Sequence, residues 1–110
     1  MNKKILTFFI TSICLLFWAC TSFALVTQYQ EAVNAYKRKD YATAYQLILP
    51  LAKKGFSKAQ YSLGVMYEKG KGVNKDSDKA QKWFQFAADQ GLAKAQKKLN
   101  PKLEDPPKTL

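Results

Sequence analysis

The chain has 110 residues, of which 18 are lysine or arginine and 8 are aspartate or glutamate, so its formal net charge is +10. It contains no histidine and only two cysteines, Cys14 and Cys20. The lack of histidine excludes the side chain that most often acts as a general base or metal ligand near neutral pH. The length suits one small domain, and the positive charge favours acidic partners or surfaces.

The first 24 residues have the parts of a secretory signal peptide. A basic start precedes an apolar run of 15 residues, Ile5–Ala19, and a short region of small residues follows it. Ser22 and Ala24 occupy the minus-three and minus-one positions of an A-x-A-like cleavage site. The apolar run is shorter than the ~20 residues that a membrane-spanning helix needs. We therefore predict a signal peptide over residues 1–24, cleavage after Ala24, and a periplasmic or secreted protein.

Two alternatives stay open for this segment. Cys20 ends a stretch, Leu-Leu-Phe-Trp-Ala-Cys, that loosely resembles a bacterial lipobox, so lipidation there would give a lipoprotein. Retention of the segment would instead give a membrane-anchored form. Cleavage would remove both cysteines and two lysines, which leaves 86 residues with 16 basic and 8 acidic side chains and a net charge of +8. Packing alone would then hold the domain together, because no disulfide could form.

Apolar residues in the rest of the chain recur with the period of a helix. Two segments each carry one apolar stripe at i, i+3, i+4, i+7 and i+8, a spacing that excludes strands. The stripe residues are Ala44, Leu47, Ile48, Leu51 and Ala52 in the first segment and Ala80, Trp83, Phe84, Ala87 and Ala88 in the second. The pattern predicts helices over about 26–38, 41–54, 58–69 and 77–90, and a short fifth helix over 93–99.

Capping residues set the expected helix ends. Asp40 and Asp76 are placed to cap helix N-termini. Gly55 and Gly91 are placed to take the left-handed conformation that follows a helix. The segment 57–60, Ser-Lys-Ala-Gln, has the form of a capping box. These signals predict short turns between the helices.

Other local features carry further expectations. Pro50 lies inside the second predicted helix, so a kink or a restart is expected there. Gly91 is expected to pack beside the next helix, whereas the 70–75 loop is expected to have slack. The stretch 100–110 has three prolines and no apolar period, which predicts a disordered tail.

The sequence also repeats itself. Shifting residues 39–63 by 36 positions onto 75–99 gives nine identities, where chance would give about one or two. The identical pairs are Lys39/Lys75, Asp40/Asp76, Ala44/Ala80, Ala52/Ala88, Gly55/Gly91, Lys58/Lys94, Ala59/Ala95, Gln60/Gln96 and Leu63/Leu99. A helix hairpin therefore occurs twice.

Small, aromatic and glycine positions in the second hairpin follow a specific pattern. They are Ala59, Leu63, Gly64, Tyr67, Gly70, Gly72, Val73, Asp76, Ala80, Trp83, Phe84, Ala87, Ala88, Gly91 and Ala95. With this pattern the segment resembles one complete Sel-1-like repeat, a relative of the tetratricopeptide repeat. Residues 29–60 resemble the shorter tetratricopeptide-style unit that often opens such arrays. We accordingly expect one domain over 25–99, with repeats over 29–58 and 59–95 and a short terminal helix.

The resemblance implies an all-α fold, a short right-handed α-solenoid of antiparallel helix hairpins. It further implies a small exported bacterial adaptor or scaffold whose concave side binds a protein or peptide. Cysteine-rich relatives have been linked to β-lactam hydrolysis, which makes a hydrolase of that type a remote alternative. Residues 25–110 contain no cysteine, however, and the six carboxylates of the predicted helical region are caps or dispersed. We therefore expect no enzyme, with no catalytic residue, no metal site and no cofactor.

Five residues are candidates for binding a partner. Lys58, Tyr61, Val65 and Glu68 lie on the face of the third predicted helix opposite its core stripe, and the resemblance implies that this face lines the groove. An apolar pair within a polar surface suits a peptide anchor. Phe86 stands where the family usually has a polar residue, which suggests an exposed contact site. The alternative is that all five are ordinary surface residues.

Other partners are also considered. Self-association could cover the incomplete C-terminal end of a two-repeat array. Lysines cluster at both repeat junctions, at Lys53, Lys54 and Lys58 and again at Lys94, Lys97 and Lys98. A basic structural protein held on an anionic envelope surface is therefore the alternative function. Nucleic acid is disfavoured, because an exported chain meets little of it.

Overall fold

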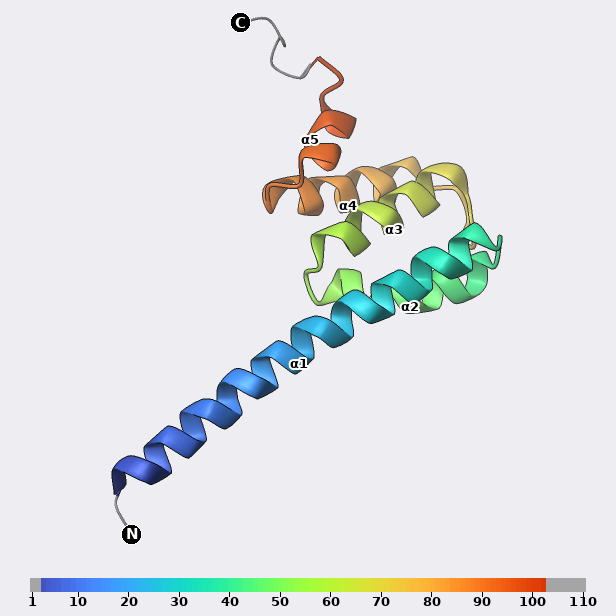
Figure 1. Cartoon of the computed structure of the whole chain (residues 1–110). Coiled ribbons are helices and arrows are strands. Elements are labelled where there is room, and N and C mark those ends of the chain that lie inside the picture. The colour runs from blue at the N-terminus through green and yellow to red at the C-terminus, as the bar shows by residue number, and fades with distance from the viewer. Residues whose placement is uncertain (1–2, 103–110) are drawn as a thin grey trace, which may run out of the picture.

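A computed structural model describes residues 3–102, and this part of the chain is helical throughout with no strand. Its five helices are α1 (Lys3–Lys37), α2 (Tyr41–Lys53), α3 (Ser57–Lys69), α4 (Ser77–Asp89) and α5 (Ala93–Leu99). Each helix packs against its neighbours in the chain, so that α1–α2 and α3–α4 form two stacked hairpins (Figure 1). This is the all-α solenoid of helix hairpins that the sequence predicts. Most of the predicted tail, residues 103–110, lies outside the described residues.

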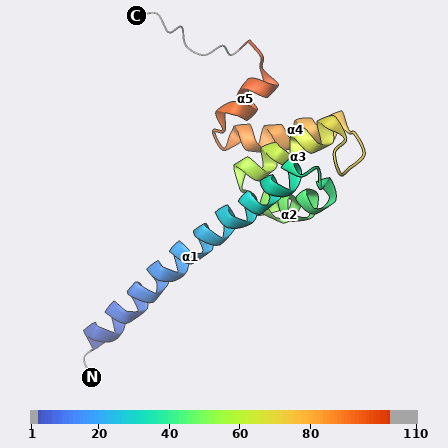
Figure 2. The same cartoon turned by 45° about the vertical axis from the view of Figure 1, so that its right-hand side comes forward.

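The first helix is longer than predicted, because it begins at Lys3 and not near residue 26. No glycine or proline occurs between Lys3 and Lys37, so nothing in the sequence ends the helix. Figures 1 and 2 show its N-terminal half projecting away from the other helices. Phe23 is 75% exposed, whereas Leu25 packs against the core. No helix in the described range is both long and apolar enough to span a membrane.

Three of the turns between helices share one hydrogen-bonded geometry. Gly55 and Gly91 have φ angles of +93° and +89°, which confirms their predicted left-handed conformation. Lys39 takes the same place after α1 with φ +64°, although it is not a glycine. In each turn the left-handed residue and the next one donate backbone N–H groups to carbonyls three and five residues earlier. These bonds satisfy carbonyls that the helix ends would otherwise leave free.

The two predicted aspartate caps are present. The Oδ1 atom of Asp40 accepts a hydrogen bond from the Thr43 N–H at 3.3 Å, and that of Asp76 accepts one from the Lys79 N–H at 3.1 Å. Hydrogen bonding to Thr43, first from its side chain and then from its backbone N–H, lowers the pKa of the Asp40 carboxyl below its ordinary value. The predicted capping box is wrong, because α3 starts after Phe56, which makes no side-chain cap. Ser57 is already the first helical residue.

Gln60, expected in that capping box, is instead a buried polar residue with 6% exposure. Its Nε2 atom donates to the carbonyl oxygen of Ala52 at 3.2 Å, and its Oε1 atom accepts from Gln90 Nε2 at 2.7 Å. Gln60 thus ties α3 to the C-terminal ends of α2 and α4. Gln96 repeats the first of these bonds at the carbonyl oxygen of Ala88, also at 3.2 Å.

Small residues let the helices approach closely. Among the residues whose burial the structure describes, nine of the fourteen buried apolar residues are alanines. The ring of Phe84 covers Gly64, where an added Cβ would lie 2.6 Å from the Cε1 atom. Larger side chains such as Ile48 fill the space between the hairpins. α2 continues through Pro50 as one helix, so the expected restart does not occur. Pro50 and Gln46 are both exposed, so water can satisfy the carbonyl of Gln46 that the proline cannot bond.

The loop between α3 and α4 is tightly packed, contrary to the expected slack. A Cβ on Gly72 would lie 2.6 Å from the carbonyl oxygen of Tyr41 at the start of α2. One on Gly70 would lie 3.2 Å from the Cβ of Lys75. The side chain of Val73 packs against the core. At Gly91 the expectation of close packing is also wrong, since an added Cβ would meet nothing within 4 Å.

Candidate functional site

Two adjoining cavities form a groove between α1, α3 and the start of α5. The first, of about 250 Å³, is mainly apolar and is lined by Val33, Tyr36, Lys37, Ile48, Tyr61, Ser62 and Val65. The second, of about 510 Å³, is lined by Tyr29, Gln30, Val33, Lys37, Lys58, Tyr61, Ser62, Leu92, Ala93 and Lys94. Four lining residues are common to both cavities. We treat the two as one feature, called the groove below.

Three of the predicted partner-binding residues line this groove. Tyr61 borders both cavities, Val65 borders the apolar one, and Lys58 borders the larger one. The ring of Tyr61 packs against that of Phe84 with 5.5 Å between the centroids. This contact fixes the Tyr61 ring on the α3–α4 hairpin while part of it faces the groove. Lys58, Tyr61 and Val65 can therefore touch one bound segment together.

Glu68 lies near the far end of α3 and lines neither cavity. Its Oε1 atom is 3.0 Å from the Lys98 Nζ atom on α5. Lys98 in turn lies over the ring of Phe84, 5.8 Å from the centroid. Glu68 therefore helps to hold α5 against the second hairpin, a role that its spacing along α3 does not reveal.

Phe86 is apart from the groove and borders none of the cavities described here. Its side chain is 52% exposed, and its ring meets the edge of Trp83 with 5.6 Å between centroids. The two rings form an apolar patch on α4. The five predicted candidates thus do not form one site. Three of them line the groove, Glu68 holds α5 in place, and Phe86 is exposed on another surface.

The groove also contains residues of α1 that the sequence analysis did not single out. Tyr29, Val33 and Tyr36 recur at i, i+4 and i+7, so their shared face was visible in the spacing. The Tyr29 hydroxyl is 2.9 Å from the Ser62 Oγ atom, which links α1 to α3 across the groove. Only the packing of α1 beside α3 shows that this face is opposite Tyr61.

Charge in the larger cavity is of one sign. Lys37, Lys58 and Lys94 come from α1, α3 and α5, and no aspartate or glutamate lines either cavity. All three lysines are exposed. The ion pairs that the structure gives for Glu31 and Glu68 use Arg38 and Lys98 instead. The groove is therefore apolar at one end and positively charged at the other.

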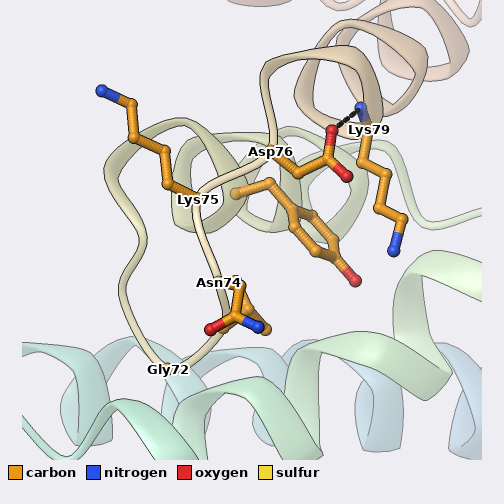
Figure 3. A pocket seen from close by; sticks show the side chains of 7 residues that line it. Gly72, Asn74, Lys75, Asp76 and Lys79 are labelled. Atoms are coloured by element: carbon orange, nitrogen blue, oxygen red, sulfur yellow. Dashed lines mark hydrogen bonds between the residues drawn. The ribbon is translucent and has the colours of Figure 1, made fainter.

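A third cavity, of about 680 Å³, lies beside the α3–α4 loop and is largely polar (Figure 3). In it the Asp76 carboxylate accepts from the Lys79 backbone N–H as a helix cap. The Tyr67 hydroxyl is 3.3 Å from the Tyr45 hydroxyl. This hydrogen bond, together with burial, raises the pKa of Tyr67 to about 12. These groups fix the loop against the first hairpin, and none is poised as a nucleophile or base.

Metal ligands do not gather in the described part of the chain, where no three or more aspartate, glutamate, histidine or cysteine residues lie close enough to hold an ion. The side chains that line the groove offer van der Waals contact, hydrogen bonding and attraction to negative charge.

Comparisons with known proteins agree with the repeat architecture. Residues 57–92 match the Sel1 repeat. Over 46 residues, 42% of the chain, the sequence is 50% identical to the chitin synthase regulatory factor 3 of Schizosaccharomyces pombe. Over 50 residues, 46% of the chain, it is 44% identical to the chitin synthase regulator SKT5 of Saccharomyces cerevisiae. The aligned segments span only 5% and 7% of these two proteins, and no solved structure matches the chain significantly.

Proposed function

Because the chain contains a Sel1 repeat, we propose that it is a non-catalytic interaction module that binds a segment of another protein in the groove. The observation that carries this proposal is the position of Tyr61. It borders both cavities, opposite Val33 of α1 and beside Val65. A preformed hollow with an aromatic side chain is the usual site for an anchoring residue of a partner.

The two similar proteins support the same general role. Both are named as regulators of another protein and not as enzymes. Their similarity to this chain is confined to a repeat-sized segment, so it supports an interaction module in general and identifies no partner. We propose an adaptor or scaffold role for this chain on that basis.

We also propose that the module acts outside the cytoplasm, in the periplasm or as a secreted protein, after loss of residues 1–24. The apolar run and the small residues before Leu25 support export. The exposure of Phe23 beside the packed Leu25 supports a boundary at this point. Removal of residues 1–24 would leave the described core intact.

Selection of peptides from a random library on the immobilised protein tests the binding role. Peptides that bind should shift the backbone amide resonances of 29–37 and 58–65. They should bind at least about tenfold more weakly to Val65→Arg, which fills and charges the apolar cavity. Gln81→Arg, at an exposed site on α4, is the matched control and should bind normally. Peptides that shift other residues and bind Val65→Arg equally well would contradict the proposal.

The exposed lysines favour a second candidate, attachment to an anionic envelope surface. Salt distinguishes the two functions, because a contact made by charge weakens steeply with ionic strength while an apolar anchor persists. Binding that is lost in moderate salt and is unchanged by Val65→Arg would favour surface attachment over the groove.

A further inference from the structure

The groove has two ends of different chemistry, and their arrangement restricts what it can bind. Its apolar cavity contains one cationic residue, Lys37, which also borders the larger cavity. Lys58 and Lys94 complete the positive end. A ligand that fits both ends must carry an apolar group and negative charge close together.

The three lysines are free to meet such a ligand. They extend from three separate helices, and none forms an ion pair within the described residues. No carboxylate lines the groove in the unbound protein. A carboxylate of a bound ligand would therefore supply the negative charge that the groove itself lacks and would attract each lysine.

The apolar cavity of the groove favours an acidic peptide over other anionic ligands. Val33, Ile48 and Val65 surround a hollow of about 250 Å³, which offers contact area for one large apolar side chain. A nucleic acid or a sulfated polysaccharide would engage the lysines but would leave this hollow empty. Near it the Tyr29 hydroxyl and the Ser62 Oγ atom, 2.9 Å apart, are held in place by each other and can bond a peptide backbone.

We infer that the groove binds an acidic peptide segment, with one large apolar side chain in the cavity between Val33 and Val65 and with carboxylates facing Lys37, Lys58 and Lys94. This inference rests on the proposed function and adds the chemical class of the partner. Because Lys37 borders both cavities, at least one carboxylate lies within a few residues of the apolar anchor.

The peptides selected in the library experiment above supply the first test. Those that shift the resonances of 29–37 and 58–65 should be enriched in aspartate and glutamate around a single leucine, isoleucine, phenylalanine or methionine. Neutral or basic peptides bound in the groove would overturn the acidic-ligand inference while leaving the proposed function standing. Peptides bound elsewhere would contradict the proposed function itself.

Charge reversal supplies the second test, with one labelled acidic peptide from the selection as the probe. The triple variant Lys37→Glu, Lys58→Glu, Lys94→Glu should weaken binding by at least about tenfold at low salt, and less as salt rises. The control variant Lys53→Glu, Lys79→Glu, Lys82→Glu has the same net charge, and its changes lie outside the groove. Equal losses in the two variants would show that net charge and not the groove attracts the probe, which would overturn the inference.

Two further measurements use the same samples. Circular dichroism should give the same helix content for both triple variants, which shows that lost binding does not come from unfolding. Heparin should compete with the probe poorly, since it has no apolar anchor. If heparin competes as well as the unlabelled peptide at equal negative charge, the ligand is a polyanion, and the inference of a peptide ligand is overturned.

Discussion

Gln60 and Gln96 lie 36 residues apart and make the same hydrogen bond, each from its Nε2 atom to the carbonyl oxygen eight residues earlier. Only Gln60 is buried, and only Gln60 accepts a second bond, from Gln90. A hydrogen bond that recurs at the 36-residue shift therefore contributes differently to stability at its two positions. Burial makes the difference, because an unsatisfied carbonyl costs more where water cannot reach it.

Gln60→Ala should accordingly lower the free energy of unfolding by about 1–3 kcal/mol. Gln96→Ala should cost less, because water can replace its bond at the exposed site. The two substitutions change helix propensity equally, so each is the control for the other. Urea denaturation followed by circular dichroism measures both. Equal losses of unfolding free energy in the two variants would mean that the burial of Gln60 does not strengthen its contribution to stability.

Gly72→Ala should destabilise the fold more than Gly91→Ala. Both residues have positive φ, +75° and +89°, so each alanine bears a left-handed backbone cost of about 1–2 kcal/mol. At Gly72 the new methyl would also meet the Tyr41 carbonyl oxygen, which should add about 1–3 kcal/mol. Thermal melts of the two variants decide the order. A reversed order would show that the 70–75 loop moves away from α2 without cost.

The hydrogen bond between Tyr45 and Tyr67 should be visible in an alkaline titration. With the pKa of Tyr67 raised to about 12 from an ordinary value of 10.0, its contribution to stability is complete below pH 10 and disappears as pH rises through 12. Tyr45→Phe should return the Tyr67 pKa toward 10. Tyrosinate absorbance measures the shift, and Tyr61→Phe is the control. An unchanged titration in Tyr45→Phe would place the cause elsewhere.

Phe86→Lys should weaken association of the protein with itself or with a partner at this surface. The ring is half exposed and packs against Trp83 in a T-shaped arrangement, so its loss should cost folding only about 0.5–1.5 kcal/mol. Sedimentation velocity of both forms measures the association, and circular dichroism checks the fold. A wild-type protein that remains monomeric, with a variant that binds its partner equally well, would leave the groove as the contact site.

The exported protein should begin at Leu25. Ser22 and Ala24 are the residues that we propose for the cleavage site, and packing of Leu25 against the core would leave the domain intact after cleavage there. Intact-mass analysis of the protein recovered from the native cell decides this point. A mass that includes Met1, or a lipid attached to Cys20, would contradict the prediction.

Local chemistry determined much of this protein from the sequence alone. Within the described residues, the apolar period and the capping signals placed both ends of α2, α3, α4 and α5 to within one residue. Asp40 and Asp76 capped helices as expected, and Gly55 and Gly91 adopted left-handed turns. Each of these features depends on residues within a few positions of one another. The nine identities at a shift of 36 residues then showed that the same local pattern occurs twice, which predicted the repeat.

Tertiary structure alone decided how residues far apart in the chain meet. Periodicity put Tyr61 and Val65 on one face of α3, but the opposite wall of the groove came from Val33 and Tyr36 of α1. Glu68 shared the face of Tyr61 and was nevertheless bound to Lys98 of α5. The sequence predicted a loose loop around Gly72, because the Tyr41 carbonyl that lies against this glycine is distant in the sequence. A helical pattern identifies which side of a helix is apolar, whereas close packing of side chains selects the neighbour that covers it.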